Sequence, residues 1–203
     1  MSKIIYVDMD GVLCDFDKGM ALHKGTKYPQ TKESFWVNLS PIEGAIEAVK
    51  ELAESNEVWI LTAPSLKNPA CYSGKRIWVE QNLGFDFVER LIICPNKGLL
   101  NGDILIDDNK EGRGQEYFDG VLVHFGGDAY KNWNDILKVY GEKEEYSITL
   151  NKYYTKDFTV SVRAKSEDDA LKLAYLKFDH HKYESEGPML LLESQESYSV
   201  TKK

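Results

Sequence analysis

The sequence contains few cysteines, no long hydrophobic run and no excess of basic residues. Its three cysteines, Cys14, Cys71 and Cys94, are odd in number and lack the spacing of a zinc site, so reduced thiols without a chemical role fit better than a disulfide framework. No apolar stretch approaches the ~18 to 20 residues of a membrane span, and the first residues lack the apolar segment of a signal peptide. We therefore expect a cytoplasmic protein with no membrane partner.

Acidic residues outnumber basic ones. The 33 Asp and Glu residues against 25 Lys and Arg residues give a formal charge of −8 at pH 7, and the pI is about 5.1. Such a surface repels phosphate backbones, so we expect no long nucleic acid as a partner. A small anionic substrate remains compatible with this charge, because a bound cation can reverse the field inside one cleft. The 203 residues suffice for one sizeable domain, alone or with a small appendage.

Short apolar runs rich in β-branched residues alternate with helical patterns over residues 1–141. The expected strands are Ile4–Val7, Val58–Leu61, Leu91–Cys94, Ile104–Ile106 and Val121–His124, and the expected helices are Ile42–Glu54, Ser73–Asn82 and Trp133–Tyr140. This alternation is typical of an α/β fold with a doubly wound, mostly parallel, Rossmann-like sheet. The polar segment 17–40 interrupts the alternation after the first strand, and we expect it to form a short cap, or lid.

The C-terminal part of the chain has a different pattern. A charged break at 141–145 is expected to be a linker. Beyond it we expect strands at Tyr146–Leu150, Phe158–Val162 and Met189–Leu192, and a capped helix at Ser166–Phe178. The prediction is therefore a core domain over 1–141 and a small ββαβ-like α+β appendage over 146–203. Homodimerisation is one of the roles that the sequence leaves open for this appendage.

Acidic pairs follow two of the expected strands. Asp8 and Asp10 come directly after the first strand, and Asp107 and Asp108 follow the fourth. Because parallel strands end at one edge of a sheet, these carboxylates are expected to face one cleft, where their repulsion calls for a cation. Mg²⁺ prefers such hard oxygen ligands. A solvated turn explains Asp10-Gly11 equally well when it is taken alone, but the second acidic pair weakens that explanation.

Two further polar residues stand at expected strand ends. Thr62 supplies a hydroxyl group, and Lys97 supplies a cation that can hold a phosphate. Each has an alternative interpretation, Thr62 as an ordinary strand-end residue and Lys97 as an exposed loop lysine. Their order and spacing relative to the acidic pairs favour a shared phosphate site.

The order of these residues carries a family resemblance. Asp-x-Asp-Gly-Val, then a run ending in Thr, then Lys, then a run ending in Asp-Asp resembles the four-motif signature of the haloacid dehalogenase-like phosphohydrolases. More narrowly, the chain resembles the 5′(3′)-deoxyribonucleotidases in the segments 8–16, 35–37, 41–45, 60–64, 75–80, 96–97 and 105–108. The resemblance covers residues 3–140 and leaves the appendage unmatched.

The resemblance implies catalytic and metal-binding roles. Asp8 would be the nucleophile that takes the phosphoryl group and forms an aspartyl phosphate. Asp10 would be the general acid that protonates the leaving oxygen and later activates water. Mg²⁺ would be held by Asp8, by the backbone carbonyl of Asp10 and by Asp107 and Asp108, and would allow two anions to meet.

The resemblance also implies substrate-binding residues. Thr62, the backbone of Ala63 and Lys97 would bind the phosphate oxygens. The relatives place aromatic rings around the base and sugar at the positions of Phe16, Phe35 and Trp36. Packing in the core or in the lid is the alternative role for these rings.

Three hypotheses of function follow from these residues. The first is a Mg²⁺-dependent hydrolase that dephosphorylates (deoxy)ribonucleoside monophosphates, with a small nucleotide as its partner. The second keeps this chemistry but acts on a sugar phosphate, a phosphoprotein or a polynucleotide 3′ end, because a short lid leaves the cleft open. The third is a non-catalytic interaction protein on this scaffold, and the two intact acidic pairs count against it.

Overall fold

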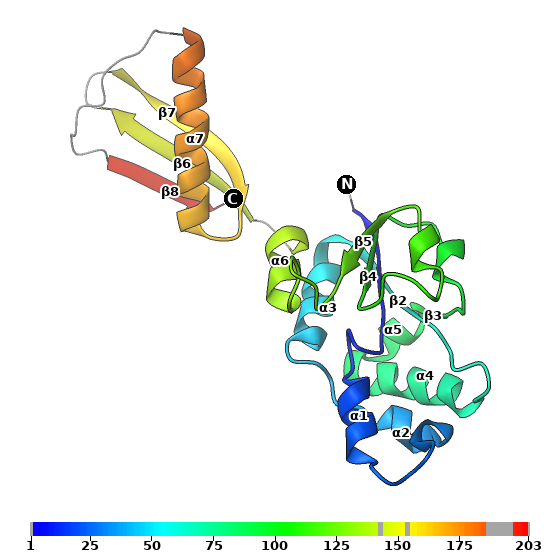
Figure 1. The fold of residues 1–203 in the computed structure, drawn as a ribbon. Coiled ribbons are helices and arrows are strands. Elements are labelled where there is room, and N and C mark those ends of the chain that lie inside the picture. The colour runs from blue at the N-terminus through cyan, green and yellow to red at the C-terminus, as the bar shows by residue number, and fades with distance from the viewer. Residues whose placement is uncertain (1, 142–143, 153–154, 186–196, 203) are drawn as a thin grey trace. The chain divides into compact units, whose positions relative to one another are not determined.

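In a computed structural model the chain divides into two compact units, residues 1–141 and residues 142–203. The structure describes residues 2–141, 144–152, 155–185 and 197–202 (Figure 1). Each unit is described by itself below.

The first unit is built on a five-stranded sheet. Its strands are β1 (Ile4–Val7), β2 (Glu57–Thr62), β3 (Leu91–Ile93), β4 (Ile104–Asp107) and β5 (Val121–His124). They lie in the order β3-β2-β1-β4-β5, and every neighbouring pair is parallel. The expected doubly wound α/β fold is confirmed, and each strand agrees with its predicted bounds to within one residue.

The helices between and after these strands differ from the predicted ones mainly at their starts. They are α3 (Ala45–Ser55), α4 (Ala70–Leu83), α5 (Phe85–Val88) and α6 (Trp133–Tyr140). Helix α3 begins three residues later than expected, because Ile42 donates its N–H to Leu13 O at 2.9 Å and Gly44, with φ +75°, caps the helix. Helix α4 begins three residues earlier than expected, since the restricted φ of Pro69 suits a helix start.

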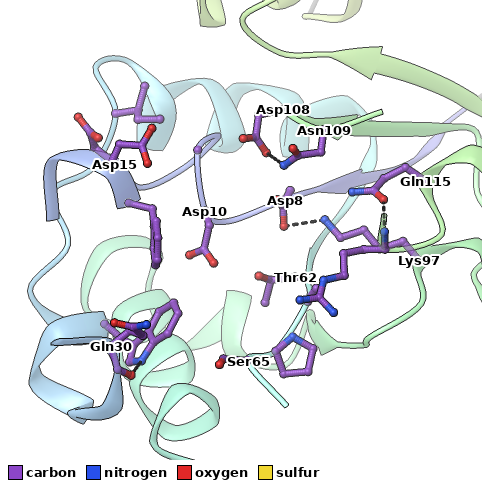
Figure 2. A pocket seen from close by; sticks show the side chains of 18 residues that line it. Asp8, Asp10, Asp15, Gln30, Thr62, Ser65, Lys97, Asp108, Asn109 and Gln115 are labelled. Atoms are coloured by element: carbon purple, nitrogen blue, oxygen red, sulfur yellow. Dashed lines mark hydrogen bonds and ion pairs between the residues drawn. The ribbon is translucent and has the colours of Figure 1, made fainter. Parts of the chain in front are cut away.

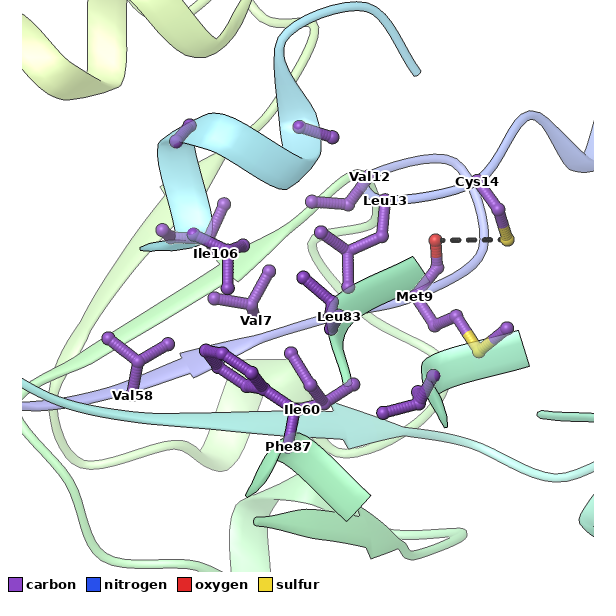
Figure 3. Packing of buried hydrophobic residues seen from close by; sticks show 14 of the residues in the cluster. Val7, Met9, Val12, Leu13, Cys14, Val58, Ile60, Leu83, Phe87 and Ile106 are labelled. Carbon is purple, nitrogen blue, oxygen red and sulfur yellow. Dashed lines mark hydrogen bonds between the residues drawn. The ribbon is translucent and has the colours of Figure 1, made fainter. Parts of the chain in front are cut away.

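Both faces of the sheet are buried, which explains why its strands are apolar at successive positions. Ile5 and Val7 face one side together with residues of α3, α4 and α6, while Tyr6 faces the other side. Figure 3 shows Val7, Ile60 and Ile106 side by side on the first face. This packing fixes the strand ends that carry the polar residues.

A short cap follows β1 and consists of α1 (Phe16–Leu22), the 3₁₀ turn η1 (Pro29–Thr31) and α2 (Glu33–Val37). Figure 1 shows α1 and α2 beyond the end of β1. The indole N–H of Trp78 in α4 donates to Leu39 O at 2.8 Å in a buried position. Gly74 in α4 lets α2 approach closely, because a Cβ at this position would lie 2.6 Å from the Cβ of Trp36.

The second unit is an antiparallel sheet, β7-β6-β8, with one helix packed on it. Its elements are β6 (Glu144–Lys152), β7 (Thr155–Ala164), α7 (Glu167–Ser185) and β8 (Ser197–Lys202). Strand β6 begins inside the segment expected to be a linker, because its pairing with β7 extends to Glu144. The expected strand Met189–Leu192 lies outside the described residues, and β8 was not expected because only Tyr198 and Val200 in it are apolar. No helix in the described ranges is long and apolar enough to cross a membrane.

Substituting Gly74 by Ala should push α2 away from α4. Because the added methyl group meets a Cβ atom and not a flexible chain end, we expect the free energy of unfolding to fall by about 1–3 kcal/mol despite the better helix propensity of Ala. Urea unfolding measures this change. The exposed Gln81 on the same helix provides the control, since Gln81→Ala should change stability by less than about 0.5 kcal/mol. A Gly74→Ala variant as stable as the wild type would contradict the close packing of the cap.

Candidate active site

The expected polar residues meet at one edge of the sheet. Asp8 follows β1, Thr62 ends β2 and Asp107 ends β4, while Lys97 begins the 3₁₀ turn η2 (Lys97–Leu99) after β3. All four side chains are buried. Asp8, Thr62 and Lys97 line a cavity of about 730 Å³ together with Asp10 and Asp108, whereas Asp107 is not among the lining residues. Figure 2 shows Asp8, Asp10 and Thr62 between Gln30 on one side and Lys97 on the other.

Three carboxylates gather at this edge of the sheet, and two of them, Asp8 and Asp108, line the cavity. Oxygen atoms of Asp8, Asp107 and Asp108 lie within 4.8 Å of one another. The ammonium group of Lys97 bridges two of them, at 2.7 Å from Asp8 Oδ1 and 2.5 Å from Asp107 Oδ2. Lys97 is 1% exposed, so it is the buried counter-charge of this cluster and not the exposed loop lysine of the alternative interpretation.

Asp107 is further held by groups that the sequence did not single out. Gln115 in η3 (Gln115–Tyr117) donates from Nε2 to both oxygens of Asp107, each at 3.2 Å, and Asn109 donates its backbone N–H to Oδ1 at 2.9 Å. Gln115 is itself 2% exposed. Because donors from Lys97, Gln115 and Asn109 surround the Asp107 carboxylate, its orientation is fixed.

The clustered charges shift the pKa values of their neighbours. Burial and the adjacent charges of Asp8 and Asp107 raise the pKa of Asp108 to about 6. Burial, with the charge of Asp8, also raises the pKa of Asp107, although Lys97 opposes that shift. For Lys97 itself burial acts downward, but Asp8 and Asp107 outweigh it and raise the pKa. The site therefore carries more negative charge than its lysine neutralises.

This donor set fits a hard divalent cation. Three carboxylates whose oxygens lie within 4.8 Å of one another are the ligands that Mg²⁺ prefers. Burial, with the charge of Asp8, raises the pKa of both Asp107 and Asp108, and a bound cation would favour their ionised forms. The side chain of Asp10 is not part of this group and pairs with Lys75. The family resemblance implies that Asp10 would contribute its backbone carbonyl. Binding of Mg²⁺ by Asp8, Asp10, Asp107 and Asp108 stays a prediction.

The carboxylate of Asp10 is paired with Lys75, a residue that was not expected in the site. Lys75 Nζ lies 2.8 Å from Asp10 Oδ2 and 2.6 Å from Thr62 Oγ1. Burial raises the pKa of Asp10, and Asp8 adds to this while Lys75 opposes it. Lys75 lies four residues after Cys71 and three before Trp78, which places it on the apolar face of α4. A lysine on the apolar face of a helix is the sequence pattern that could have pointed to Lys75 as a residue of the site.

The turn after β1 depends on a glycine. Gly11 has φ +79°, a conformation that other residues rarely adopt, and a Cβ at this position would lie 2.4 Å from Asp108 Oδ2. The turn is also held from α6, where the Trp133 indole donates to Val12 O at 3.1 Å. The thiol of Cys14 lies 3.4 Å from Met9 O and 3.6 Å from Asp10 Oδ1, so Cys14 packs beside the carboxyl group of Asp10.

Aromatic rings form another part of the cavity wall. Phe16 and Trp36 line the cavity, with ring centroids 5.7 Å apart. Phe35 is not among the lining residues but packs edge-on against both rings, at 5.5 Å from Phe16 and 5.4 Å from Trp36. The structure therefore brings two of the three expected aromatic residues to the cavity and places Phe35 behind them, in the core.

The loop after β2 supplies a further part of the wall. Ala63 and Ser65 line the cavity next to Thr62. The sequence predicted Ala63 in the site but did not predict Ser65. The thiol of Cys71 accepts the N–H of Ser65 at 3.1 Å and so ties the loop to α4. The exposed Arg113 also lines the cavity and adds a cation near its mouth.

The fold and this site define a phosphohydrolase of the haloacid dehalogenase-like class. Residues 22–154 match the sequence model described as "5' nucleotidase, deoxy (Pyrimidine), cytosolic type C protein". The chain therefore belongs to the 5′(3′)-deoxyribonucleotidase family, and the resemblance to this family is confirmed.

Relatives of several origins support this assignment. The human cytosolic 5′(3′)-deoxyribonucleotidase is 34% identical over 147 residues, which cover 55% of this chain and 73% of the relative. A Vibrio phage KVP40 protein with the same family name is 34% identical over 141 residues, covering 66% and 82%. The Bacillus subtilis 5′(3′)-deoxyribonucleotidase is 26% identical over 169 residues, covering 71% and 96%. Human and mouse mitochondrial types also match, so the cytoplasmic location stays a prediction.

Replacing Asp108 by Asn should stabilise the protein in buffer without divalent cations. A folded-state pKa of about 6 means that ionised Asp108 is disfavoured in the folded state. The shift corresponds to about 3 kcal/mol for a fully buried group, and partial exposure reduces the expected gain to about 1–2 kcal/mol at about pH 8. The gain should shrink as the pH falls through 6 and be largely lost by about pH 4, because Asp108 is then protonated in the folded state and about half protonated in the unfolded state.

Urea unfolding of wild-type protein and Asp108→Asn at both pH values measures this effect. The exposed Asp119 is the control, and Asp119→Asn should leave stability unchanged. A gain of the same size at both pH values would show that the effect does not come from the ionisation of Asp108.

Proposed function

We propose that this protein is a Mg²⁺-dependent phosphomonoester hydrolase that dephosphorylates deoxyribonucleoside and ribonucleoside monophosphates. The observation that carries the proposal is the position of one carboxylate, Asp8, on the cavity wall beside a buried lysine, a hydroxyl group and two further carboxylates. Its membership of the family adds support. The aromatic part of the wall favours nucleotides over the alternative substrates, which are sugar phosphates, phosphoproteins and polynucleotide 3′ ends.

The proposed reaction has two displacements at phosphorus. In the first, a carboxylate oxygen of Asp8 attacks the phosphorus, the bond to the ester oxygen breaks, and Asp10 gives that oxygen its proton. In the second, water attacks the phosphorus of the aspartyl phosphate and passes a proton to Asp10, which releases phosphate and restores the Asp8 carboxylate. The raised pKa of Asp10 supports this role, because a general acid must hold its proton until the leaving oxygen needs it.

Cationic and donor groups around Asp8 suit the phosphoryl group. Lys97, at 2.7 Å from Asp8, would place positive charge beside the nucleophile and the phosphate oxygens. The Thr62 hydroxyl and the backbone of Ala63 would bind the same oxygens. Mg²⁺ would be held by Asp8, the carbonyl of Asp10 and the pair Asp107-Asp108, and it would supply the charge that lets an anionic nucleophile approach an anionic phosphate.

The other part of the wall suits a nucleoside. Phe16 and Trp36 present aromatic surface in a cavity whose remaining lining is largely polar. Stacking of a base on an aromatic ring contributes about 1–3 kcal/mol and tolerates different bases. Gln30 lines the same region, and its Oε1 is the one buried side-chain acceptor of the described residues without a hydrogen-bond partner. A base with an N–H group would satisfy it.

The nucleophile and the cation can be tested together. Wild-type protein should release phosphate from deoxyribonucleoside monophosphates with Mg²⁺ and lose more than about 99% of this activity in EDTA, because the carboxylates then repel the phosphate. Asp8→Asn should reduce turnover at least about 10⁴-fold in Mg²⁺ while its circular dichroism stays native. The measurement is phosphate release, with recovery when Mg²⁺ is restored. Normal turnover by Asp8→Asn would exclude the proposed nucleophile.

The aromatic wall predicts a substrate-dependent loss. Phe16→Leu should reduce kcat/KM for a nucleoside monophosphate about 5- to 30-fold, the equivalent of about 1–2 kcal/mol of lost stacking, and leave kcat/KM for deoxyribose 5-phosphate within about twofold. Leu22, which is 73% exposed on the same helix, is the control position for Leu22→Ala. Equal losses on both substrates would mean that Phe16 packs the cap and does not contact the base.

A further inference from the structure

We infer that Lys75 is a positioning residue that holds the carboxyl group of Asp10 in the direction of the leaving oxygen. This inference rests on the proposed phosphoryl transfer, in which Asp10 protonates that oxygen. Lys75 is not among the residues that line the cavity, so it would act through Asp10 and not on the substrate.

The contacts of Lys75 fix its ammonium group in one place. Its Nζ lies 2.8 Å from Asp10 Oδ2, 2.6 Å from Thr62 Oγ1 and 3.0 Å from Ala63 O. An ammonium group has three donors, and these three acceptors use all of them. Two of the acceptors belong to the end of β2 and the loop after it, so Asp10 is tied to the same elements that would bind the phosphate.

The surroundings of Lys75 hold the rest of its side chain. Lys75 is 0% exposed on the face of α4 that also buries Cys71 and Trp78. Its Nζ lies 5.2 Å from the centre of the Trp36 ring, within the range of a cation–π interaction. Burying an ammonium group in such surroundings is costly unless it is fully paired, and an apolar side chain would fill the same space without this cost. A role in packing alone therefore does not account for a lysine here.

Asp10 depends on Lys75 more than on its other neighbour. Among the described residues, the one donor to the second oxygen, Oδ1, is the thiol of Cys14 at 3.6 Å. This thiol is a weak donor and also lies 3.4 Å from Met9 O. The Asp10 side chain remains 29% exposed, and Figure 2 shows its carboxyl group facing the cavity beside Asp8 and Thr62. Without Lys75, rotation of this carboxyl group would be limited mainly by that weak contact.

A leaving-group comparison separates positioning from folding. A nucleoside leaves as an alkoxide and needs a proton, whereas p-nitrophenolate is a stable anion and leaves without one. The parameter kcat/KM covers the steps up to departure of the leaving group, so hydrolysis of the aspartyl phosphate does not affect it. The ratio of kcat/KM values for two substrates is also independent of the fraction of folded protein in a preparation.

The test compares Lys75→Met with wild-type protein on three substrates in Mg²⁺. We expect kcat/KM to fall at least about 30-fold for a nucleoside monophosphate and to a similar degree for deoxyribose 5-phosphate, and less than about threefold for p-nitrophenyl phosphate. Deoxyribose 5-phosphate has no base. If kcat/KM falls for it as much as for the nucleoside monophosphate, the loss does not come from a contact between the base and Trp36. Arg76→Met changes the neighbouring residue, whose side chain is 42% exposed, and should leave all three values within about twofold.

Lys75→Arg is measured alongside, because it keeps the positive charge but not the single-atom geometry. For the nucleoside monophosphate and for deoxyribose 5-phosphate, kcat/KM of Lys75→Arg should be at least about threefold higher than kcat/KM of Lys75→Met. If Lys75→Met does not fold, Lys75→Arg provides the test. Its kcat/KM, relative to wild-type protein, should then fall at least about threefold more for the nucleoside monophosphate and deoxyribose 5-phosphate than for p-nitrophenyl phosphate. Equal losses on all three substrates, or none, overturn the role of Lys75 alone. Absence of turnover by wild-type protein overturns the proposed function itself.

Discussion

Repulsion between carboxylates at one edge of the sheet is the constraint on which the site depends. Parallel strands bring Asp8 and Asp107 to neighbouring ends, and Asp108 follows directly after Asp107. The missing side chain of Gly11 leaves room for the carboxylate of Asp108. One buried lysine, Lys97, neutralises part of this charge, while burial and the charges of Asp8 and Asp107 raise the pKa of Asp108. A fold that concentrates negative charge in this way is suited to bind a cation and, through it, an anion.

Two adjacent residues of helix α4, Gly74 and Lys75, contact the cap and the polar residues at the strand ends. Gly74 allows the backbone of α2 to approach, which places the ring of Trp36 beside the ammonium group of Lys75. Lys75 in turn contacts Asp10 and Thr62. Lys75 thus contacts both Trp36, which is proposed to contact the base, and Asp10, which is proposed to transfer the proton. A change that displaces the cap is therefore expected to disturb Asp10 as well as the nucleoside.

The strand-end residues could be predicted from the sequence because strands and the turns after them are specified locally. The polar side chains at these ends follow apolar runs, and the parallel arrangement alone brings Asp8, Thr62 and Asp107 together. Lys75 could not be placed in this way. Its role depends on which face of α4 is buried, and a lysine in a helix is usually exposed. The sequence alone also did not distinguish Phe35 from Trp36, since successive residues of a helix point about 100° apart and α2 is too short to show which one faces the cavity.

The two aspartates of the first motif are separated by one residue but have different electrostatic partners. Asp8 lies beside Lys97, which also neutralises Asp107, whereas Asp10 lies beside Lys75, whose other acceptors are uncharged. Two carboxyl groups in one cavity can take different roles when their surroundings differ in this way. The same arrangement destabilises the folded chain when no cation is bound, because part of the charge stays unpaired. A bound cation should therefore contribute both to the chemistry of the site and to the stability of the first unit.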